Sequence, residues 1–362
     1  MQCRRRACNL TACLIKTVAH KPRSSSILSV RSFHRQLLAW YDACARDLPW
    51  RESRDPYRVW VSEIMLQQTR VAAVIEHYHE FLRRFPTVEK LAAAREASVL
   101  AAWSGLGYYR RARMLHAAAK VVARGRGGRF PQTADDWRAL PGVGRYTAAA
   151  IASIAFGEAV AVVDGNVERV LQRITGKPIS GEQVWQQAES LLDRNRPGDS
   201  NQAMMELGAT VCTPRAPACL TCPLVELCMA RGELGGGEKK SRQQRRVIHY
   251  ALARRNGSVF LTQRPAEVRL MAGMWELPEI SPPADHNAPF LTVRHSITVT
   301  DYTVHVWPVS APSKGEWCRV NRLPKLALTG LARKILRESG IIPASATSVK
   351  SSRLIGRRLS DR

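Results

Sequence analysis

The stretch that decides the fold is residues 140–166, LPGVGRYTAAAIASIAFGEAVAVVDGN. Two glycines, Gly142 and Gly144, stand two positions apart before an alanine-rich apolar segment, residues 146–156, which we expect to be a helix. Backbone N–H groups at such a turn point outward and suit a phosphate oxygen. A tight turn that merely joins two helices has the same pattern, so the glycines alone leave both interpretations open.

The same stretch ends in an isolated carboxylate, Asp164, within VVDGN. A further helix is expected at residues 166–175, directly after it. Backbone N–H donors and the helix dipole at that position would hold the carboxylate in its ionised form. The alternative is an ordinary helix N-cap without a chemical role.

The charge balance of the 362-residue chain points to a polyanionic partner. It carries 55 Lys plus Arg against 30 Asp plus Glu, a formal net charge of +25. This excess favours nucleic acid first and a membrane surface second. No segment approaches eighteen uninterrupted apolar residues, so we expect a soluble protein without a membrane partner.

The first two hundred residues predict a mainly α domain, residues 32–231. Apolar side chains recur there at three- and four-residue spacing, and alternating strand patterns are nearly absent up to residue 230. Residues 56–69 are apolar on almost every face, which predicts a helix in the core with Glu63 at its middle. Further helices are expected from residue 32 and at residues 71–85, 88–94, 96–103, 110–123, 134–139, 183–192 and 201–211.

The pattern changes at residue 232. Residues 232–246 are glycine-rich and basic, which predicts a flexible linker. Residues 247–345 predict a smaller α+β domain. Its strands are expected at residues 247–253, 259–263, 290–293 and 302–309, and its helix at residues 326–337.

Both ends of the chain are basic and lack a pattern that would form a core. Residues 1–31 hold seven Lys or Arg and no acid, and residues 346–362 form a basic tail. The first segment lacks the continuous apolar core of a secretory signal. A disordered extension, an organelle transit peptide and a misassigned start codon all remain open for it.

Four cysteines crowd into seventeen residues with the spacing C-x6-C-x2-C-x5-C. They are Cys212, Cys219, Cys222 and Cys228. Four thiolates in so short a loop bind a soft metal or a cluster, in a reducing compartment. Zinc sites usually show two close cysteine pairs and only one is present, so the spacing favours a [4Fe–4S] cluster. Nothing else indicates electron transfer, so we expect a structural cluster whose loop presents basic groups to phosphate.

Glu63 is the expected partner of Asp164. Burial in an apolar helix raises the pKa of a carboxyl group, so Glu63 should keep a proton near neutral pH. One protonated and one ionised carboxyl group is what cleavage of a glycosidic bond requires. The alternatives are an ion pair between Glu63 and an arginine, and a plain capping role for Asp164.

Seven motifs taken together resemble the MutY adenine DNA glycosylases, the iron–sulfur members of the helix-hairpin-helix, or endonuclease III, superfamily. They are LPWR (48–51), SEIMLQQT (62–69), GLGYY (105–109), LPGVG (140–144), VDGNV (163–167), NQAMM (201–205) and the cysteine loop (212–228). The resemblance is dense from residue 32 to residue 231 and thins beyond the linker. It implies two helical subdomains with an iron–sulfur loop, followed by a shortened Nudix-like α+β domain.

The resemblance implies base-excision repair by a monomeric enzyme. Adenine opposite 8-oxoguanine or guanine would be flipped out of double-stranded DNA and removed by hydrolysis. Glu63 would be the general acid and Asp164 would stabilise the oxocarbenium or covalent intermediate, with Asn166 and Tyr146 orienting these groups. The remaining contacts to adenine and DNA would come from Arg51, Gln67, Gln68, Thr69, Leu106, Tyr108, Gly142 and Gly144. Such an enzyme is expected in a bacterial cytoplasm or nucleoid, or in a nucleus or mitochondrion, and not outside the cell.

Endonuclease III itself, a pyrimidine glycosylase and lyase, is the nearest alternative. In that enzyme a lysine just after the hairpin glycines forms a Schiff base with the sugar. Tyr146 takes this position here, and no lysine lies between Lys120 and Lys177. We therefore expect a monofunctional glycosylase. A DNA-binding protein that has lost catalysis is the other alternative, and the presence of both carboxylates argues against it.

The second domain of the family resembles a Nudix fold and checks the base opposite adenine. LMAGMWELP (270–278) resembles its turn, but the helix with the R-E-x-x-E-E metal ligands is missing, so we do not expect a nucleotide pyrophosphohydrolase. By position, Ile297 and Thr298 replace the first two residues of the family's Phe-Ser-His reader of 8-oxoguanine, and Val299 replaces its histidine. We expect Thr298 to contact the lesion and discrimination against adenine opposite guanine to be reduced.

Overall fold

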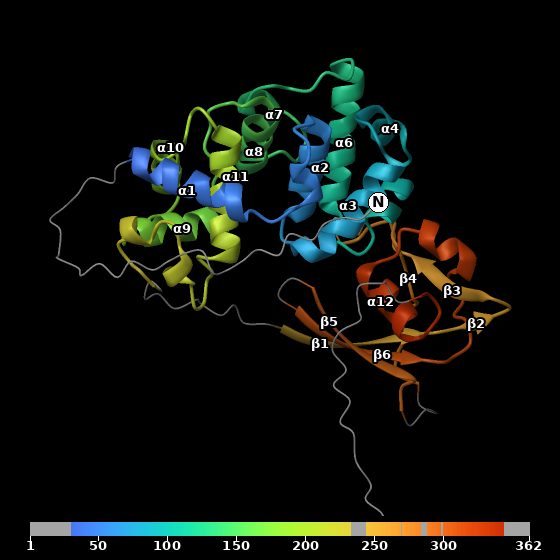
Figure 1. Ribbon diagram of the computed structural model, residues 1–362. Coiled ribbons are helices and arrows are strands. Elements are labelled where there is room, and N and C mark those ends of the chain that lie inside the picture. Colours follow the sequence, from blue (N-terminus) through green and yellow to red (C-terminus); the bar gives the residue numbers. More distant parts are fainter. Residues whose placement is uncertain (1–29, 233–243, 269, 284–287, 298–299, 344–362) are drawn as a thin grey trace, which may run out of the picture.

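The computed structural model describes residues 30–232, 244–268, 270–283, 288–297 and 300–343 (Figure 1). Helices occupy the first part of the chain, as the periodicity predicts. They are α1 (Val30–Cys44), α2 (Pro56–Leu66), α3 (Val71–Arg84), α4 (Val88–Ala93), α5 (Glu96–Trp103), α6 (Arg110–Lys120), α7 (Ala134–Arg138), α8 (Arg145–Phe156), α9 (Gly165–Thr175), α10 (Glu182–Ser190) and α11 (Pro197–Thr210). Short helical turns lie at η1 (Pro49–Arg51), η2 (Val121–Gly125), η3 (Cys219–Thr221) and η4 (Val225–Leu227).

Two helix boundaries differ from the expected ones for local reasons. Helix α2 ends at Leu66, so the expectation of a helix to Thr69 is wrong. Gln68 has a φ of 55°, in the left-handed region that breaks a helix. Helix α11 begins at Pro197, four residues before the expected start, because proline suits the first turn, where its missing N–H is not needed.

Buried apolar side chains form two clusters in the helical part, which makes two subdomains. The larger cluster draws on α2 to α8 and is filled by large side chains such as Trp60, Trp103 and Trp137. The smaller one draws on α1, α9, α10 and α11. Figure 1 shows this second group of helices on one side of the molecule and α2 to α6 on the other. No helix in the described ranges is long and apolar enough to cross a membrane.

Within the described ranges the strands all follow residue 243 and form two small sheets. They are β1 (Gln244–Ala251), β2 (Arg254–Arg255), β3 (Ser258–Gln263), β4 (Trp275–Glu276), β5 (Leu291–Ile297), β6 (Thr300–Trp307) and β7 (Glu316–Arg319). In the first sheet β6 lies between β1, to which it runs parallel, and β5, to which it runs antiparallel. In the second, β3 pairs with β2, β4 and β7. Strand β5 extends beyond its expected end because it pairs with β6 along its whole length.

The expected C-terminal helix starts later than predicted. Residues 320–325 form a 3-10 turn, η5 (Val320–Lys325), and α12 runs over Gly330–Glu338. The start of α12 is fixed by Thr329, whose hydroxyl accepts a hydrogen bond from the N–H of Ala332 at 3.1 Å. The expectation of a helix from residue 326 is therefore wrong: Leu328 forms an isolated bridge with Trp275, and the helix begins only at Gly330.

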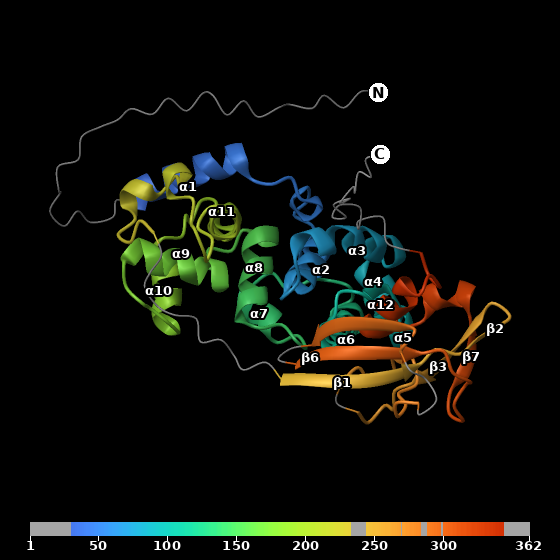
Figure 2. The ribbon, with the colours of Figure 1, turned by 90° about the horizontal axis from the view of Figure 1, so that it is seen from below.

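The C-terminal unit, residues 244–343, packs directly on the helical part. Met274 and Ala327 of this unit are buried in the larger helical cluster, with exposed fractions of 0% and 4%. Arg113 Nη2 also donates to the carbonyl of Ala272 at 2.5 Å. Figures 1 and 2 both show the unit beside α3 and α6 and away from α9 and α10. Residues 233–243 of the expected linker lie outside the described residues.

Candidate active site

A cleft of about 1500 Å³ opens between the two helical subdomains and the C-terminal unit. Its lining contains every residue of the helical part for which the sequence predicts a catalytic or DNA-contacting role. These are Arg51, Glu63, Gln67, Gln68, Thr69, Leu106, Tyr108, Gly142, Gly144, Tyr146, Asp164 and Asn166. The motifs that are far apart in the sequence thus meet in one place.

Glu63 lies near the end of α2 and is 5% exposed. Burial raises the pKa of its carboxyl group to about 7. A hydrogen bond from Tyr146 lowers this pKa, the charge of Asp164 raises it, and the charge of Arg51 lowers it. A carboxyl group with this pKa is about half protonated at neutral pH and largely protonated one pH unit below it. The structure therefore supports the expected proton store, whereas the alternative of a direct ion pair with an arginine finds no contact among the described residues.

Tyr146, in the first turn of α8, contacts Glu63 directly. Its hydroxyl donates to Glu63 Oε2 at 2.8 Å and also lies 3.4 Å from Met205 Sδ. Burial, and then the charge of Glu63, raise the pKa of the phenol well above its ordinary value, so it remains a donor. Because Oε2 accepts this bond, the acidic proton of Glu63 belongs on Oε1. The sequence analysis assigned no role to Met205.

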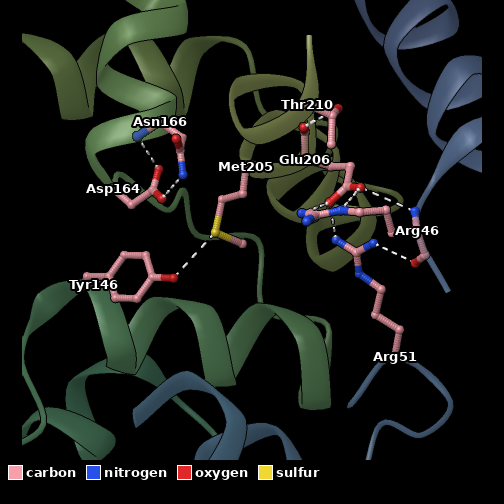
Figure 3. A network of polar contacts seen from close by, with 8 residues as sticks. All are labelled: Arg46, Arg51, Tyr146, Asp164, Asn166, Met205, Glu206 and Thr210. Atoms are coloured by element: carbon pink, nitrogen blue, oxygen red, sulfur yellow. Dashed lines mark hydrogen bonds and ion pairs between the residues drawn. The ribbon is translucent and has the colours of Figure 1, made fainter. Parts of the chain in front are cut away.

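Asp164 caps α9, as the sequence predicts. Its Oδ1 accepts from the N–H groups of Asn166 at 2.9 Å and Val167 at 2.7 Å. Its Oδ2 accepts from Asn166 Nδ2 at 2.8 Å. Arg169 Nη2 in turn donates to Asn166 Oδ1 at 2.8 Å, which fixes the orientation of that amide. Figure 3 shows Asp164 and Asn166 on the far side of Met205 from Glu206. The capping geometry and the position in the cleft occur together, so the fold is compatible with both interpretations of Asp164.

Arg51 reaches the cleft as part of a charged cluster that the sequence analysis missed. Its Nη2 donates to Glu206 Oε2 at 2.9 Å, and Arg46 binds the same carboxylate at 2.6 and 2.8 Å (Figure 3). Glu206 is 1% exposed. Burial raises its pKa, but the hydrogen bonds and charges of both arginines outweigh burial and leave the pKa below its ordinary value. An acid between Met205 and Leu207 is the sequence pattern that would have indicated this buried carboxylate.

The fold requires glycine at position 142 but leaves room for a side chain at position 144. Gly142 has a φ of 74°, and a Cβ atom there would lie 2.3 Å from Met114 Cβ, so no other residue fits. Gly144 is the N-cap of α8 and has open space around it, without a side chain that caps the helix. The start of α8 thus has no side-chain cap at Gly144, and Gly144, Arg145 and Tyr146 line the cleft, an arrangement that suits an anion site.

Two loops at the mouth of the cleft are tied together by one arginine, which the sequence analysis also missed. Arg111 donates to the carbonyls of Ile64 at 2.9 Å and Met65 at 3.0 Å, and also to the carbonyl of Gln67. Across the cleft mouth it donates to the carbonyls of Leu106 and Gly107, both at 3.3 Å. Burial lowers the pKa of this guanidinium to about 10, which still leaves it charged.

The side chains on these two loops differ in their exposure and in their hydrogen bonds. Gln67 Nε2 donates to Thr147 Oγ1 at 3.0 Å, whereas Leu106 is buried at 5% exposure. The ring of Tyr108 is 47% exposed and lies under the Arg111 guanidinium at 5.3 Å. Gln68 and Tyr108 both have a positive φ, of 55° and 48°, which is uncommon outside glycine and typical of functional loops.

The C-terminal unit contributes His295 and Ser296 of β5 to the cleft lining. Burial, and then the charge of Lys334, lower the pKa of His295. Thr298, predicted to contact the lesion, and Val299 lie outside the described residues. The sequence analysis gave His295 and Ser296 no role, because the resemblance to the family pointed to the positions after them.

The four cysteines lie in one loop after α11, all partly buried and none in a disulfide. Arg173 Nη1 donates to Cys212 Sγ at 3.3 Å and to the carbonyl of Thr213 at 2.7 Å. Cys228 Sγ lies 3.3 Å from the carbonyl of Arg173. Within the described parts of the chain no group of three or more His, Cys, Asp or Glu side chains is arranged to hold a metal ion.

Comparison with known proteins agrees with the helical fold and the hairpin. Residues 61–193 match the HhH-GPD superfamily of base excision DNA repair proteins. The adenine DNA glycosylase of Rattus norvegicus is 50% identical over 228 residues, which are 59% of this chain and 44% of that protein. The adenine DNA glycosylase of Arabidopsis thaliana is 39% identical over 320 residues, 73% of this chain and 49% of that protein. The chain thus spans about half the length of these relatives, or less.

This chain also matches almost the full length of one solved structure. It is a thermostable thymine-DNA glycosylase, 32% identical, with a TM-score of 0.53 over 56% of this chain and 96% of that one. The chain belongs to the HhH-GPD superfamily of base excision DNA repair proteins.

Proposed function

We propose that the chain is a DNA glycosylase that removes adenine mispaired with 8-oxoguanine or guanine in double-stranded DNA. The observation that carries this proposal is the pair of carboxyl groups in one cleft: Glu63 with a pKa of about 7 and Asp164 at a helix N-terminus. The relatives named as adenine DNA glycosylases support adenine as the base.

The geometry supplies the groups that the reaction needs. Glu63 Oε1 would donate its proton to N7 of the flipped adenine, so that the C1′–N9 bond breaks and its electron pair leaves with a neutral base. Asp164 would face the sugar and stabilise the cation at C1′, with Asn166 and Tyr146 as orienting residues. Water would then add its hydroxyl to C1′ and return its proton to Glu63.

Arg51 would line the adenine pocket. Its guanidinium is held by Glu206 and by the carbonyl of Arg46, at 2.9 and 3.0 Å, so its position does not depend on substrate. This pre-arrangement favours binding of one base in one orientation.

DNA would be held at the mouth of the cleft. The glycines of the hairpin, Gly142 and Gly144, would bind the backbone next to the flipped nucleotide through N–H groups. The two loops that carry Gln67, Gln68, Thr69, Leu106 and Tyr108 would enter the helix where the adenine leaves. The exposed ring of Tyr108 fits a role in stacking on bases. We infer that the protein acts as a monomer.

A lyase reaction finds no support in the cleft. None of the described residues that line it is a lysine, and Tyr146 takes the place that a lysine would need. Schiff-base formation with the sugar requires such an amine. We infer a monofunctional enzyme.

We infer that Cys212, Cys219, Cys222 and Cys228 hold a [4Fe–4S] cluster. The chemistry of the donor set fits: four free thiols lie within seventeen residues of one loop. The guanidinium of Arg173, beside Cys212 Sγ, would offset the negative charge that such a site accumulates. When bound, the cluster would stabilise the loop rather than take part in the reaction. Iron and sulfide analysis of purified protein, with a serine variant of Cys222 as control, tests this inference.

We further propose that the C-terminal unit, as a shortened Nudix-like domain, contacts the base opposite adenine. Support comes from its packing beside the cleft and from His295 and Ser296 in the cleft lining. Thr298 follows the same strand and would contact the lesion.

The proposal is tested by single-turnover assays on three duplexes, with adenine opposite 8-oxoguanine, adenine opposite guanine, and thymine opposite guanine. We expect release of adenine from the first two and no release of thymine. Release of thymine alone would instead assign the activity named for the thymine-DNA glycosylase. An Asp42 to asparagine variant, altered at the surface, serves as control because this residue pairs with Arg196 away from the cleft.

A further inference from the structure

The loop from Ser104 to Tyr109, which joins α5 and α6, is held at both ends by one carbonyl of the C-terminal unit. Ser104 Oγ donates to the carbonyl of Leu328 at 2.7 Å, and the hydroxyl of Tyr109 donates to the same oxygen at 3.2 Å. The three residues have exposed fractions of 5%, 0% and 4%, for Ser104, Leu328 and Tyr109 in turn. A carbonyl oxygen has two lone pairs, so it accepts both bonds at once.

Three residues of the loop between these two anchors have a positive φ. Gly105, Gly107 and Tyr108 have φ values of 114°, 69° and 48°. The positive φ of Tyr108 is unfavourable for a residue with a side chain, and its ring is 47% exposed, with the Arg111 guanidinium over one face. The hydrogen bonds at the two ends therefore matter for the shape of the loop.

The accepting carbonyl is itself fixed within the C-terminal unit. The residues before and after Leu328 are both hydrogen-bonded to Trp275. The N–H of Trp275 donates to the carbonyl of Ala327 at 2.8 Å, and the N–H of Thr329 donates to the carbonyl of Trp275 at 2.9 Å. Arg333 of α12 donates to Ser104 Oγ at 2.9 Å, which directs the hydroxyl proton of Ser104 toward Leu328. The position of the loop thus depends on the C-terminal unit, in addition to Trp103 and Arg111, which donate to the carbonyl of Gly107 from the helical part.

We propose that Ser104 and Tyr109 are positioning residues through which the C-terminal unit sets the loop that enters DNA beside the flipped adenine. The proposal rests on the proposed function in one respect, namely that this loop meets DNA. Binding of the C-terminal unit to the opposite base would then change how readily adenine is extruded, and leave the proton transfer from Glu63 unaffected.

The first test needs no DNA and no activity. Ser104→Ala combined with Tyr109→Phe removes both donors and keeps the packing volume nearly unchanged. We expect the backbone amides of residues 105–108 to exchange hydrogen on the order of tenfold faster than in the unaltered protein. Ser104→Thr alone keeps both hydroxyl donors, so its amides should exchange as slowly as those of the unaltered protein.

Tyr57→Phe is the matched control. Tyr57 also donates to a buried carbonyl, that of Phe85 at 2.7 Å, and is 3% exposed in the same apolar cluster, but it does not bound the loop. Exchange in residues 105–108 should be unchanged in this variant. Equal acceleration in both variants, or none in the double variant, would overturn the proposal.

The second test measures extrusion and chemistry separately. A duplex with 2-aminopurine next to a 2′-fluoro-deoxyadenosine, which resists cleavage, reports extrusion by its fluorescence. We expect the double variant to lower the fluorescence rise and the single-turnover rate by about tenfold, while the pH midpoint of that rate stays unchanged. A shifted midpoint, or a rate and fluorescence within twofold of the unaltered protein, would contradict the proposal. If the unaltered protein releases no adenine, the proposed function fails, and the exchange experiment alone decides whether the loop is held as described.

Discussion

Replacing Glu63 by glutamine should abolish adenine excision and at the same time stabilise the folded protein above neutral pH. Glutamine has almost the same shape and still accepts the hydrogen bond from Tyr146, so the pocket is kept while the proton source is lost. Loss of excision without loss of duplex binding is the expected functional result. The stability effect has the opposite sign because the fold holds an ionisable carboxyl group where burial disfavours its charge.

The magnitude follows from the pKa of Glu63, which rises from 4.5 to about 7 on folding. A group whose pKa is raised on folding contributes stability that is fully present below the unfolded pKa and is lost as the pH rises through the folded one. The window therefore runs from pH 4.5 to about 7. A pKa shift of this size corresponds to a free energy of unfolding of on the order of 3 kcal/mol, which the unaltered protein loses across this window. The glutamine variant does not titrate and does not lose it.

The assay is urea unfolding of both proteins at several pH values. The free energy of unfolding of Glu63→Gln, relative to the unaltered protein, should increase between pH 5 and pH 8 and then level off. Glu206→Gln is the control of opposite sign, because that buried carboxylate pairs with Arg46 and Arg51 and its pKa is lowered. Replacing the Glu206 carboxylate should lower the free energy of unfolding by about 3 kcal/mol above pH 5. A glutamine variant at Glu63 that is less stable at pH 8, or equally stable at every pH, would refute the reasoning.

Three further predictions concern the cleft. Tyr146→Phe removes a hydrogen bond that lowers the pKa of Glu63, so the midpoint of the pH–rate profile should move to higher pH; a midpoint that stays or falls would exclude this role. Arg111→Met should weaken base extrusion, measured by 2-aminopurine fluorescence, by on the order of 2 kcal/mol. Arg111→Lys should not restore it, because an ammonium cannot reproduce the fork of donors. Asp164→Asn should slow excision by about a hundredfold or more, and borohydride should trap little adduct from the unaltered protein; efficient trapping would favour a lyase.

Local sequence patterns were sufficient to place the hairpin and most helices. Helix α8 was expected from residue 146 and begins at Arg145, and α9 was expected from residue 166 and begins at Gly165. Glycine turns, caps and helical periodicity involve neighbours in the chain, so a sequence displays them directly. The end of α2 was misplaced because an apolar pattern continues past Leu66 although the backbone turns at Gln68.

The motif residues predicted for the site do line one cleft, and their chemical roles stay predictions. The sequence did not indicate the groups that hold these residues in place. Glu206 lies 155 residues from Arg51, and nothing in the sequence pairs the two. Arg111 stands in a run of basic residues that looks like a solvated surface, yet its guanidinium is buried under carbonyls of two loops. Contacts of this kind depend on tertiary packing, which a periodic pattern does not contain.

The arrangement of the C-terminal unit was not predictable for the same reason. Met274 belongs to a segment that resembles a turn, and its burial in the helical cluster follows only from the docking of the two parts. The expected lesion contact at Thr298 remains a prediction, since that residue lies outside the described ranges. His295 and Ser296 were not predicted to line the cleft, because the positions that align with the family's reader come directly after them in the sequence.

The central claim, that Glu63 is the proton donor of an adenine glycosylase, is tested most directly by the pH dependence of single-turnover adenine release opposite 8-oxoguanine. The pKa of about 7 predicts a rate that is highest in the acid range and falls through a midpoint near pH 7, and no comparable release by Glu63→Gln at any pH. Adenine release by that variant at the rate of the unaltered protein, or a rate that does not change between pH 5 and pH 9, would contradict the account.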